Sequence, residues 1–139
     1  MTLTSGLNIR SMAVEHRRDF TDTCAFFISG SEKTMFFCPD IDQWAGMNPT
    51  LCTILSSVDF ALIDATFYDD YELPGRDMRT IPHPRVVDTV ALIKESPPTA
   101  DVVLIHLNHS NRLWLDRTLQ ESLSASRMYV GRQGMKWYI

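Results

Sequence analysis

Apolar and polar residues follow two rhythms along this chain, one typical of β-strands and one typical of helices. Five short runs have the apolar content or the two-residue alternation of strands: Leu7–Val14, Cys24–Ile28, Thr34–Cys38, Phe60–Ile63 and Asp101–Ile105. The second and third of these runs flank a turn-rich stretch, Ser29 to Lys33, and together predict a β-hairpin. The last two runs have the composition of buried strands.

Helical patterns lie between and after these runs. Thr50 is a suitable N-cap for a short helix that continues to Ser57. A second helix follows Pro84 and ends before Pro97 and Pro98, because proline cannot continue a helix. Its apolar positions, which we expect on one face, are Val86, Val87, Val90, Ala91 and Ile93.

The C-terminal part of the chain predicts one more helix and two more strands. Asp116 to Ala125 has a helical pattern, and two short strands are expected around Gly131 to Gly134. Strand, helix and strand in alternation predict an α/β fold in layers.

Composition and charge narrow the class of protein. The 139 residues are 45% hydrophobic and 22% charged, which is typical of one soluble globular domain. The net charge is -4 and no basic run is present, so nucleic-acid binding is not expected. The apolar runs are too short for a membrane span, and no secretory signal is predicted at the N-terminus. Three widely spaced cysteines favour a reducing compartment, and we expect the cytoplasm.

Side chains that can bind a metal ion occur at the ends of four predicted strands. They are His16, Asp40, Asp64 and His106. Strand ends fix the backbone while the following loop leaves the side chain free, and imidazoles with carboxylates suit zinc, iron or manganese. Each residue alone also fits a structural role, since aspartates cap turns and single histidines bond to loops. The spacing of His106 and His109 matches no closed zinc motif, so spacing leaves both interpretations open.

Five segments of the chain, taken in order, resemble known motifs. They are Met12–His16 with Thr21–Ile28, Met35–Trp44, Ala61–Asp70 with Glu72 and Leu73, Ile81–Pro84, and Leu104–Asn111. These segments are similar to motifs of the metallo-β-lactamase-fold metallohydrolases, in the branches like coenzyme PQQ synthesis protein B and ribonuclease Z. The sequence Pro-Asp-Ile-Asp-x-Trp at positions 39–44 is closer to the branch of coenzyme PQQ synthesis protein B.

The resemblance implies a role for each candidate residue. His16 and His106 would be terminal metal ligands, and Asp40 would bridge two metal ions. His83 would stabilise or protonate the reacting group, and Asp64 is the second catalytic candidate, close to the ligands. His109 would orient a ligand or its loop.

The resemblance also implies a cofactor and a fold. The cofactor would be zinc, or iron or manganese, with two ions in the complete fold, and metal-bound hydroxide would attack a small-molecule substrate. The family's main signature, H-x-H-x-D-H, does not occur in these 139 residues. The resemblance therefore implies a single partial domain, the C-terminal half of an αββα sandwich, with a mixed sheet and flanking helices. We expect weak metal binding and little turnover from such a chain alone.

Two other functions fit the same residues. The chain could be a non-catalytic remnant that acts as a binding or assembly module, either as a homodimer or with a complementing N-terminal half. The closer likeness to the PQQ branch also allows a role in cofactor biosynthesis, with oxidative, iron-dependent chemistry. The identity of a substrate does not follow from the sequence.

Overall fold

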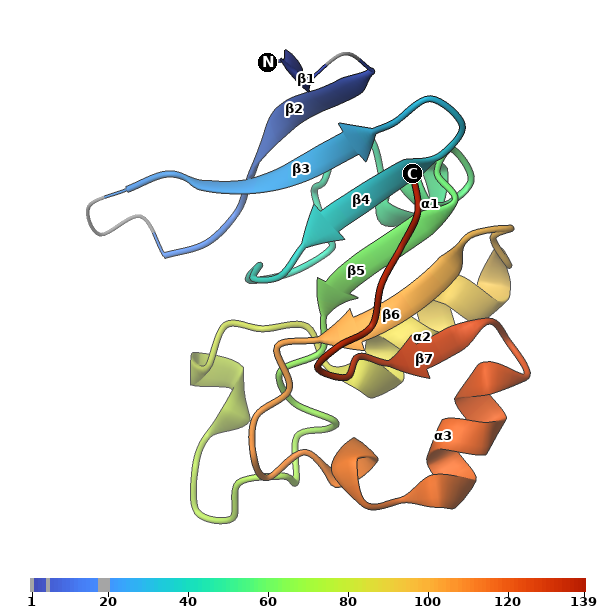
Figure 1. The fold of residues 1–139 in the computed structure, drawn as a ribbon. Coiled ribbons are helices and arrows are strands. Elements are labelled where there is room, and N and C mark those ends of the chain that lie inside the picture. The colour runs from blue at the N-terminus through green and yellow to red at the C-terminus, as the bar shows by residue number, and fades with distance from the viewer. Residues whose placement is uncertain (1, 5, 18–20) are drawn as a thin grey trace.

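The computed structural model describes residues 2–4, 6–17 and 21–139, and its centre is a mixed β-sheet (Figure 1). The seven strands lie side by side in the order in which they occur in the chain. They are β1 (Thr2–Thr4), β2 (Leu7–Val14), β3 (Thr23–Ser29), β4 (Thr34–Cys38), β5 (Phe60–Asp64), β6 (Asp101–Ile105) and β7 (Met128–Val130).

The direction of the strands changes in the middle of the sheet. Strands β1 to β4 pair antiparallel, and β4 to β7 pair parallel. Each parallel pair is joined through a helix: α1 (Leu51–Leu55), α2 (Val86–Glu95) and α3 (Arg117–Ser124). Two 3₁₀ helices, Met78–Thr80 and Arg112–Trp114, lie in the loops that follow β5 and β6. Parallel neighbours require such crossovers, so the second half of the chain consists of three βαβ units.

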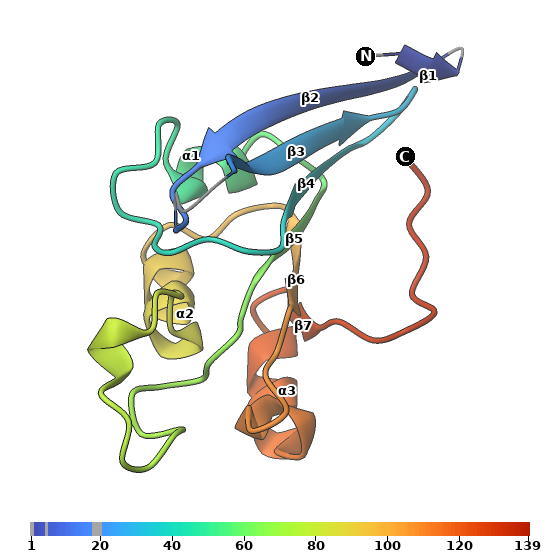
Figure 2. The same cartoon turned by 90° about the vertical axis from the view of Figure 1, so that its left-hand side faces the viewer.

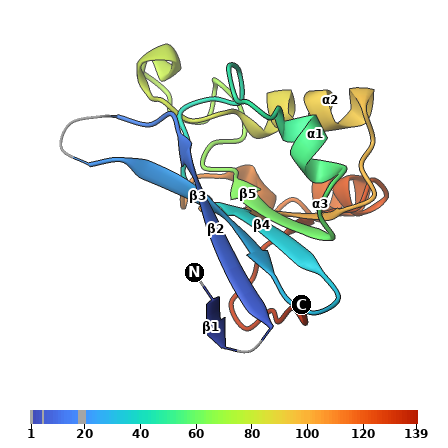
Figure 3. The same cartoon turned by 90° about the horizontal axis from the view of Figure 1, so that it is seen from above.

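All three helices cover one face of the sheet, while the C-terminal segment runs along the other (Figures 2 and 3). Residues of β5 show the division. Ala61 and Ile63 belong to the large core under the helices. Leu62 points the other way and packs with Trp137 and Ile139 of the C-terminal segment. The central strands are therefore apolar on both faces.

Most of the predicted elements are confirmed. The strands of the hairpin, β5, β6 and the three helices occur where the pattern places them, and Thr50 caps α1 by accepting a hydrogen bond from the Thr53 N–H. Among the described residues, no helix combines the length and the apolar composition that a membrane span needs.

The predicted apolar face of α2 is wrong at two positions. Val87 is 39% exposed and Ala91 is also exposed. The buried positions are Val86, Thr89 and Ile93. Thr89 is buried because its hydroxyl accepts a hydrogen bond from Trp44 Nε1 at 2.9 Å, which satisfies two polar groups in the core.

Of the two short strands predicted around Gly131 to Gly134, only the first occurs, as β7, and the second is wrong. Strand β7 ends at Val130, and residues 131–139 form no strand. Gly134 has φ +89, so the chain turns there and leaves the line of the sheet. The segment then lies against the apolar face, and a Cβ on Gly30 would stand only 2.2 Å from the backbone of Ile139. Apolar burial of Trp137 and Ile139 thus takes the place of strand pairing.

The corrected face of α2 predicts how two substitutions on the same helix differ. Ile93→Ala removes a side chain that is 1% exposed and should lower the free energy of unfolding by about 2–5 kcal/mol. Val87→Ala should change it by less than about 0.5 kcal/mol. Urea denaturation of both variants measures the difference, and equal losses would contradict the assignment of the faces.

Candidate metal centre

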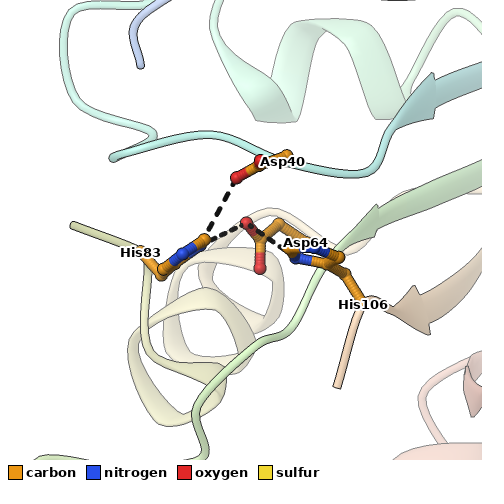
Figure 4. A group of neighbouring side chains, drawn as sticks. All are labelled: Asp40, Asp64, His83 and His106. Carbon is orange, nitrogen blue, oxygen red and sulfur yellow. Dashed lines mark hydrogen bonds and ion pairs between the residues drawn. The ribbon is translucent and has the colours of Figure 1, made fainter. Parts of the chain in front are cut away.

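Four side chains with ligand chemistry meet beyond the carboxyl ends of the parallel strands (Figure 4). Asp40 follows β4, Asp64 ends β5, His106 follows β6, and His83 comes from the loop before α2. One ligand atom from each lies within 4.8 Å of the others. Open α/β sheets bind ligands at this edge because the strands fix the positions from which the loops start.

Asp64 has no free acceptor position. Its Oδ1 accepts hydrogen bonds from the N–H and the hydroxyl of Thr66, at 2.8 and 2.7 Å. Its Oδ2 accepts from the Ile41 N–H at 3.1 Å and lies 2.8 Å from His83 Nδ1. A carboxylate has about four lone-pair positions, and here all four have donors. Because Asp64 is 1% exposed, this arrangement is what makes its burial tolerable.

Asp40 is in the opposite situation. Its Oδ1 is buried and accepts no hydrogen bond from the described residues. The nearest imidazole nitrogen, His83 Nδ1, is 3.6 Å away, which is beyond hydrogen-bonding distance. A buried carboxylate oxygen without a donor is costly, and a cation is one of the few partners that offset this cost. Asp40 is therefore the member of the group whose oxygen can still accept a partner.

His16 stands beside this group. Its Nε2 lies 3.5 Å from Asp40 Oδ2, and its ring centre is 6.2 Å from that of His83. The other ring nitrogen, Nδ1, is 2.7 Å from Asp42 Oδ1. Nε2 of His16 therefore faces Oδ2 of Asp40, the oxygen next to the buried Oδ1.

His106 lies on the other side of the group in a special backbone conformation. Its φ is +62, which is uncommon for a residue with a Cβ and often found where a side chain serves a site. The side chain is 45% exposed, and its Nδ1 is 2.8 Å from the hydroxyl oxygen of Thr66. The ring centre lies 5.7 Å from that of His83.

The loop that carries His83 is held by a buried arginine. Arg85 pairs with Asp70 at 2.7 Å and donates to the carbonyl oxygen of His83 at 2.6 Å. It also donates to the carbonyl oxygens of Met78 and Ile81. A cavity of about 420 Å³ opens beside His83 between this loop and the loop at Asp42. His83 is therefore both fixed and accessible from the cavity.

The structure thus brings together Asp40, Asp64, His83 and His106, with His16 in contact with Asp40. His109 is exposed and makes no hydrogen bond with the described part of the chain, so its orienting role stays a prediction. The sequence analysis did not predict that Thr66 and Asp42 contact the histidines of the site. The signal was present, because both stand two residues after a strand-end aspartate, the spacing of an Asx turn.

Cys38 lies under the group at the end of β4. Burial, followed by the charges of Asp64 and Asp40, raises the pKa of its thiol to about 12. Only a thiolate is a strong nucleophile or metal ligand. At neutral pH Cys38 is therefore a core side chain.

The raised pKa predicts the reactivity of the three cysteines. At pH 8 Cys38 should resist a thiol reagent in the native protein and react only after unfolding, because the thiolate fraction is about one in ten thousand. Cys24 and Cys52 are half-buried and should react first. Mass mapping of labelled cysteines measures the order, and rapid native labelling of Cys38 would contradict it.

Comparison with known proteins places this chain in a family. Residues 1–107 match the model of the beta-lactamase superfamily domain. None of the curated proteins searched matches the chain.

Two solved structures share the fold. Zn²⁺-bound PqqB from Methylobacterium extorquens superposes with a TM-score of 0.70 and 15% identity, over 98% of this chain and 52% of that one. The metallo-β-lactamase fold protein YhfI from Bacillus subtilis superposes with a TM-score of 0.61 and 17% identity, over 99% and 52%. The chain thus spans about half the length of these two proteins.

The family match covers most of the chain, and the mixed sheet with its helices agrees with both structures. The chain therefore belongs to the beta-lactamase superfamily and has the α/β architecture of metallo-β-lactamase-fold proteins.

Proposed function

We propose that the chain binds a divalent metal ion through Asp40, His16 and His106, as part of a metal-dependent hydrolase for a small molecule. The observation that carries the proposal is the buried Oδ1 of Asp40, which has no donor among the described residues. Nδ1 of His16 is engaged by Asp42 and Nδ1 of His106 by Thr66, which leaves Nε2 of both rings for a metal.

The donor set fits the proposed cofactor. Two imidazoles and a carboxylate suit zinc, and also iron or manganese. Asp64 is close enough to be a ligand, but its acceptor positions are filled, so we assign it to His83 instead. The zinc named for the PqqB structure supports zinc as the first metal to test. A second ion would need donors beyond these three.

His83 and Asp64 act on the reacting group in this proposal. Asp64 accepts a hydrogen bond from Nδ1 and so orients the ring, while the other ring nitrogen remains free to exchange a proton. The cavity beside His83 gives a small substrate access to it. A divalent cation held by Asp40, His16 and His106 would supply Lewis acidity and would lower the pKa of a bound water molecule.

A binding or assembly role remains the second candidate, and the face of the sheet opposite the helices, which the C-terminal segment covers only in part, favours it. Phe37, Phe60 and Ile105 are only partly buried there. Apolar surface of this kind favours association. A second copy of the chain, or a complementing half like the rest of the matched structures, would cover it.

Zinc binding tests the metal proposal directly. Titrated zinc should stabilise the protein, by about 2.7 kcal/mol when free zinc reaches a hundred times its Kd. Asp40→Asn should lose this effect because the amide oxygen carries no charge. Asp101→Asn is the control, since it removes a carboxylate from the opposite end of β6. Zinc stabilisation that survives in Asp40→Asn, or that is absent from the natural chain, would overturn the site.

The hydrolase proposal needs a separate measurement of turnover. His83→Asn retains a donor that can reach Asp64 but loses the second ring nitrogen. Zinc-loaded protein should hydrolyse an activated ester, p-nitrophenyl acetate, faster than this variant by about 100-fold or more, and both should bind zinc alike. Equal rates would leave the binding role as the better account.

A further inference from the structure

Two residues outside the proposed ligand set contact the Nδ1 nitrogens of its histidines. Asp42 Oδ1 is 2.7 Å from His16 Nδ1, and Thr66 Oγ1 is 2.8 Å from His106 Nδ1. A neutral imidazole carries one proton, and the nitrogen without it is the one that can bind a metal. The partner of Nδ1 therefore decides which nitrogen is available.

Asp42 favours one arrangement at His16. Asp42 and Asp40 are both carboxylates and only accept hydrogen bonds, but Asp42 is at hydrogen-bonding distance, 2.7 Å from Nδ1, whereas Asp40 is 3.5 Å from Nε2, so we place the proton of the neutral ring on Nδ1. Nε2 is then free, and it is the nitrogen that faces Asp40 Oδ2 at 3.5 Å. The Asp42 N–H also donates to the carbonyl oxygen of Glu15 at 2.9 Å. Backbone and side chain of one residue thus hold the end of β2 and its histidine together.

At His106 the hydroxyl group of Thr66 also favours a proton on Nδ1. The hydroxyl has one proton, and at 2.7 Å it donates to Asp64, a carboxylate that can only accept. Towards His106 the same oxygen must therefore accept, which requires the proton on Nδ1. His83 Nδ1 is farther from this oxygen, at 3.2 Å, and closer to Asp64.

The position of Thr66 is itself fixed by the backbone around it. Its N–H donates to Asp64, and its carbonyl oxygen accepts from the Asn108 N–H at 2.9 Å and from Asn111 Nδ2 at 3.2 Å. Asn108 lies two residues after His106. The contacts of Thr66 therefore hold both the ring and the loop of His106, whose backbone has the unfavourable φ of +62.

We propose that Asp42 and Thr66 are positioning residues that keep His16 and His106 protonated on Nδ1, so that both present Nε2 to a divalent cation at Asp40. This assignment rests on the proposed metal site. Partners of this kind typically change metal affinity by about 10- to 100-fold.

The tautomers are measured in the metal-free chain, so this part of the test needs no metal. Long-range ¹H–¹⁵N spectra, recorded in alkaline solution with the rings neutral, should show the Nδ1–H pattern for His16 and His106. Asp42→Asn should raise the share of Nε2–H at His16 alone, because its amide nitrogen can donate to Nδ1. An Nε2–H pattern for either histidine in the natural chain would overturn the proposal.

Zinc affinity is the second readout. Asp42→Asn and Thr66→Val should each weaken binding by about 10- to 100-fold, and Thr66→Ser should restore it because it keeps the hydroxyl. Thr89→Val is the matched control. It removes another buried hydroxyl, bonded to Trp44 and to the Arg85 carbonyl oxygen, and should cost stability without changing zinc affinity.

The outcomes separate the two proposals. If the natural chain does not bind zinc, the metal site itself fails, and the spectra still decide the tautomers. If the natural chain binds zinc and both Asp42→Asn and Thr66→Val bind it as tightly, the positioning role fails alone. If Thr66→Val does not fold, Asp42→Asn and the spectra of the natural chain remain decisive.

Discussion

The arrangement of the site depends on one buried carboxylate, Asp64. Its two oxygens receive donors from Ile41 in the loop after β4, and from Thr66 and His83 at the two ends of the connection between β5 and α2. Burying this charge is tolerable only with such donors, so these segments have to meet at the end of β5. Their convergence in turn sets where Asp40, His83 and His106 stand. Asp64 therefore organises the site without having a lone pair left for a ligand.

The contrast between the two aspartates gives the site its chemistry. They lie on neighbouring parallel strands whose carboxyl ends meet at one edge. Asp64 is fully bonded within the protein, whereas one oxygen of Asp40 is buried without a donor. A cation between Asp40 and the flanking histidines would satisfy that oxygen. In this chain, a carboxylate with all its acceptor positions filled thus lies beside one with a buried oxygen that has no donor among the described residues.

Sequence reasoning found the residues more readily than their contacts. Asp64 and His106 could be located because an apolar strand run ends at each, and His83 only through resemblance to family motifs. Thr66 stands two residues after Asp64, in a local spacing, but Ile41 and His83 are 23 and 19 residues from Asp64, so no local pattern contains their contacts. Thr89 was missed on α2 because burial of its hydroxyl depends on Trp44, 45 residues away. The local pattern of apolar and polar residues predicts which positions are buried and where strands end, but it does not predict hydrogen bonds between residues far apart in the sequence.

We expect a metal ion to bind Asp40 and not Asp64. A crystal structure of the zinc-soaked chain, with anomalous scattering recorded at the zinc edge, tests this claim most directly. The account predicts a zinc peak within bonding distance of Asp40 and of His16 or His106, with the hydrogen bonds of Asp64 intact. Zinc bound to Asp64, with Asp40 uncoordinated, would contradict it.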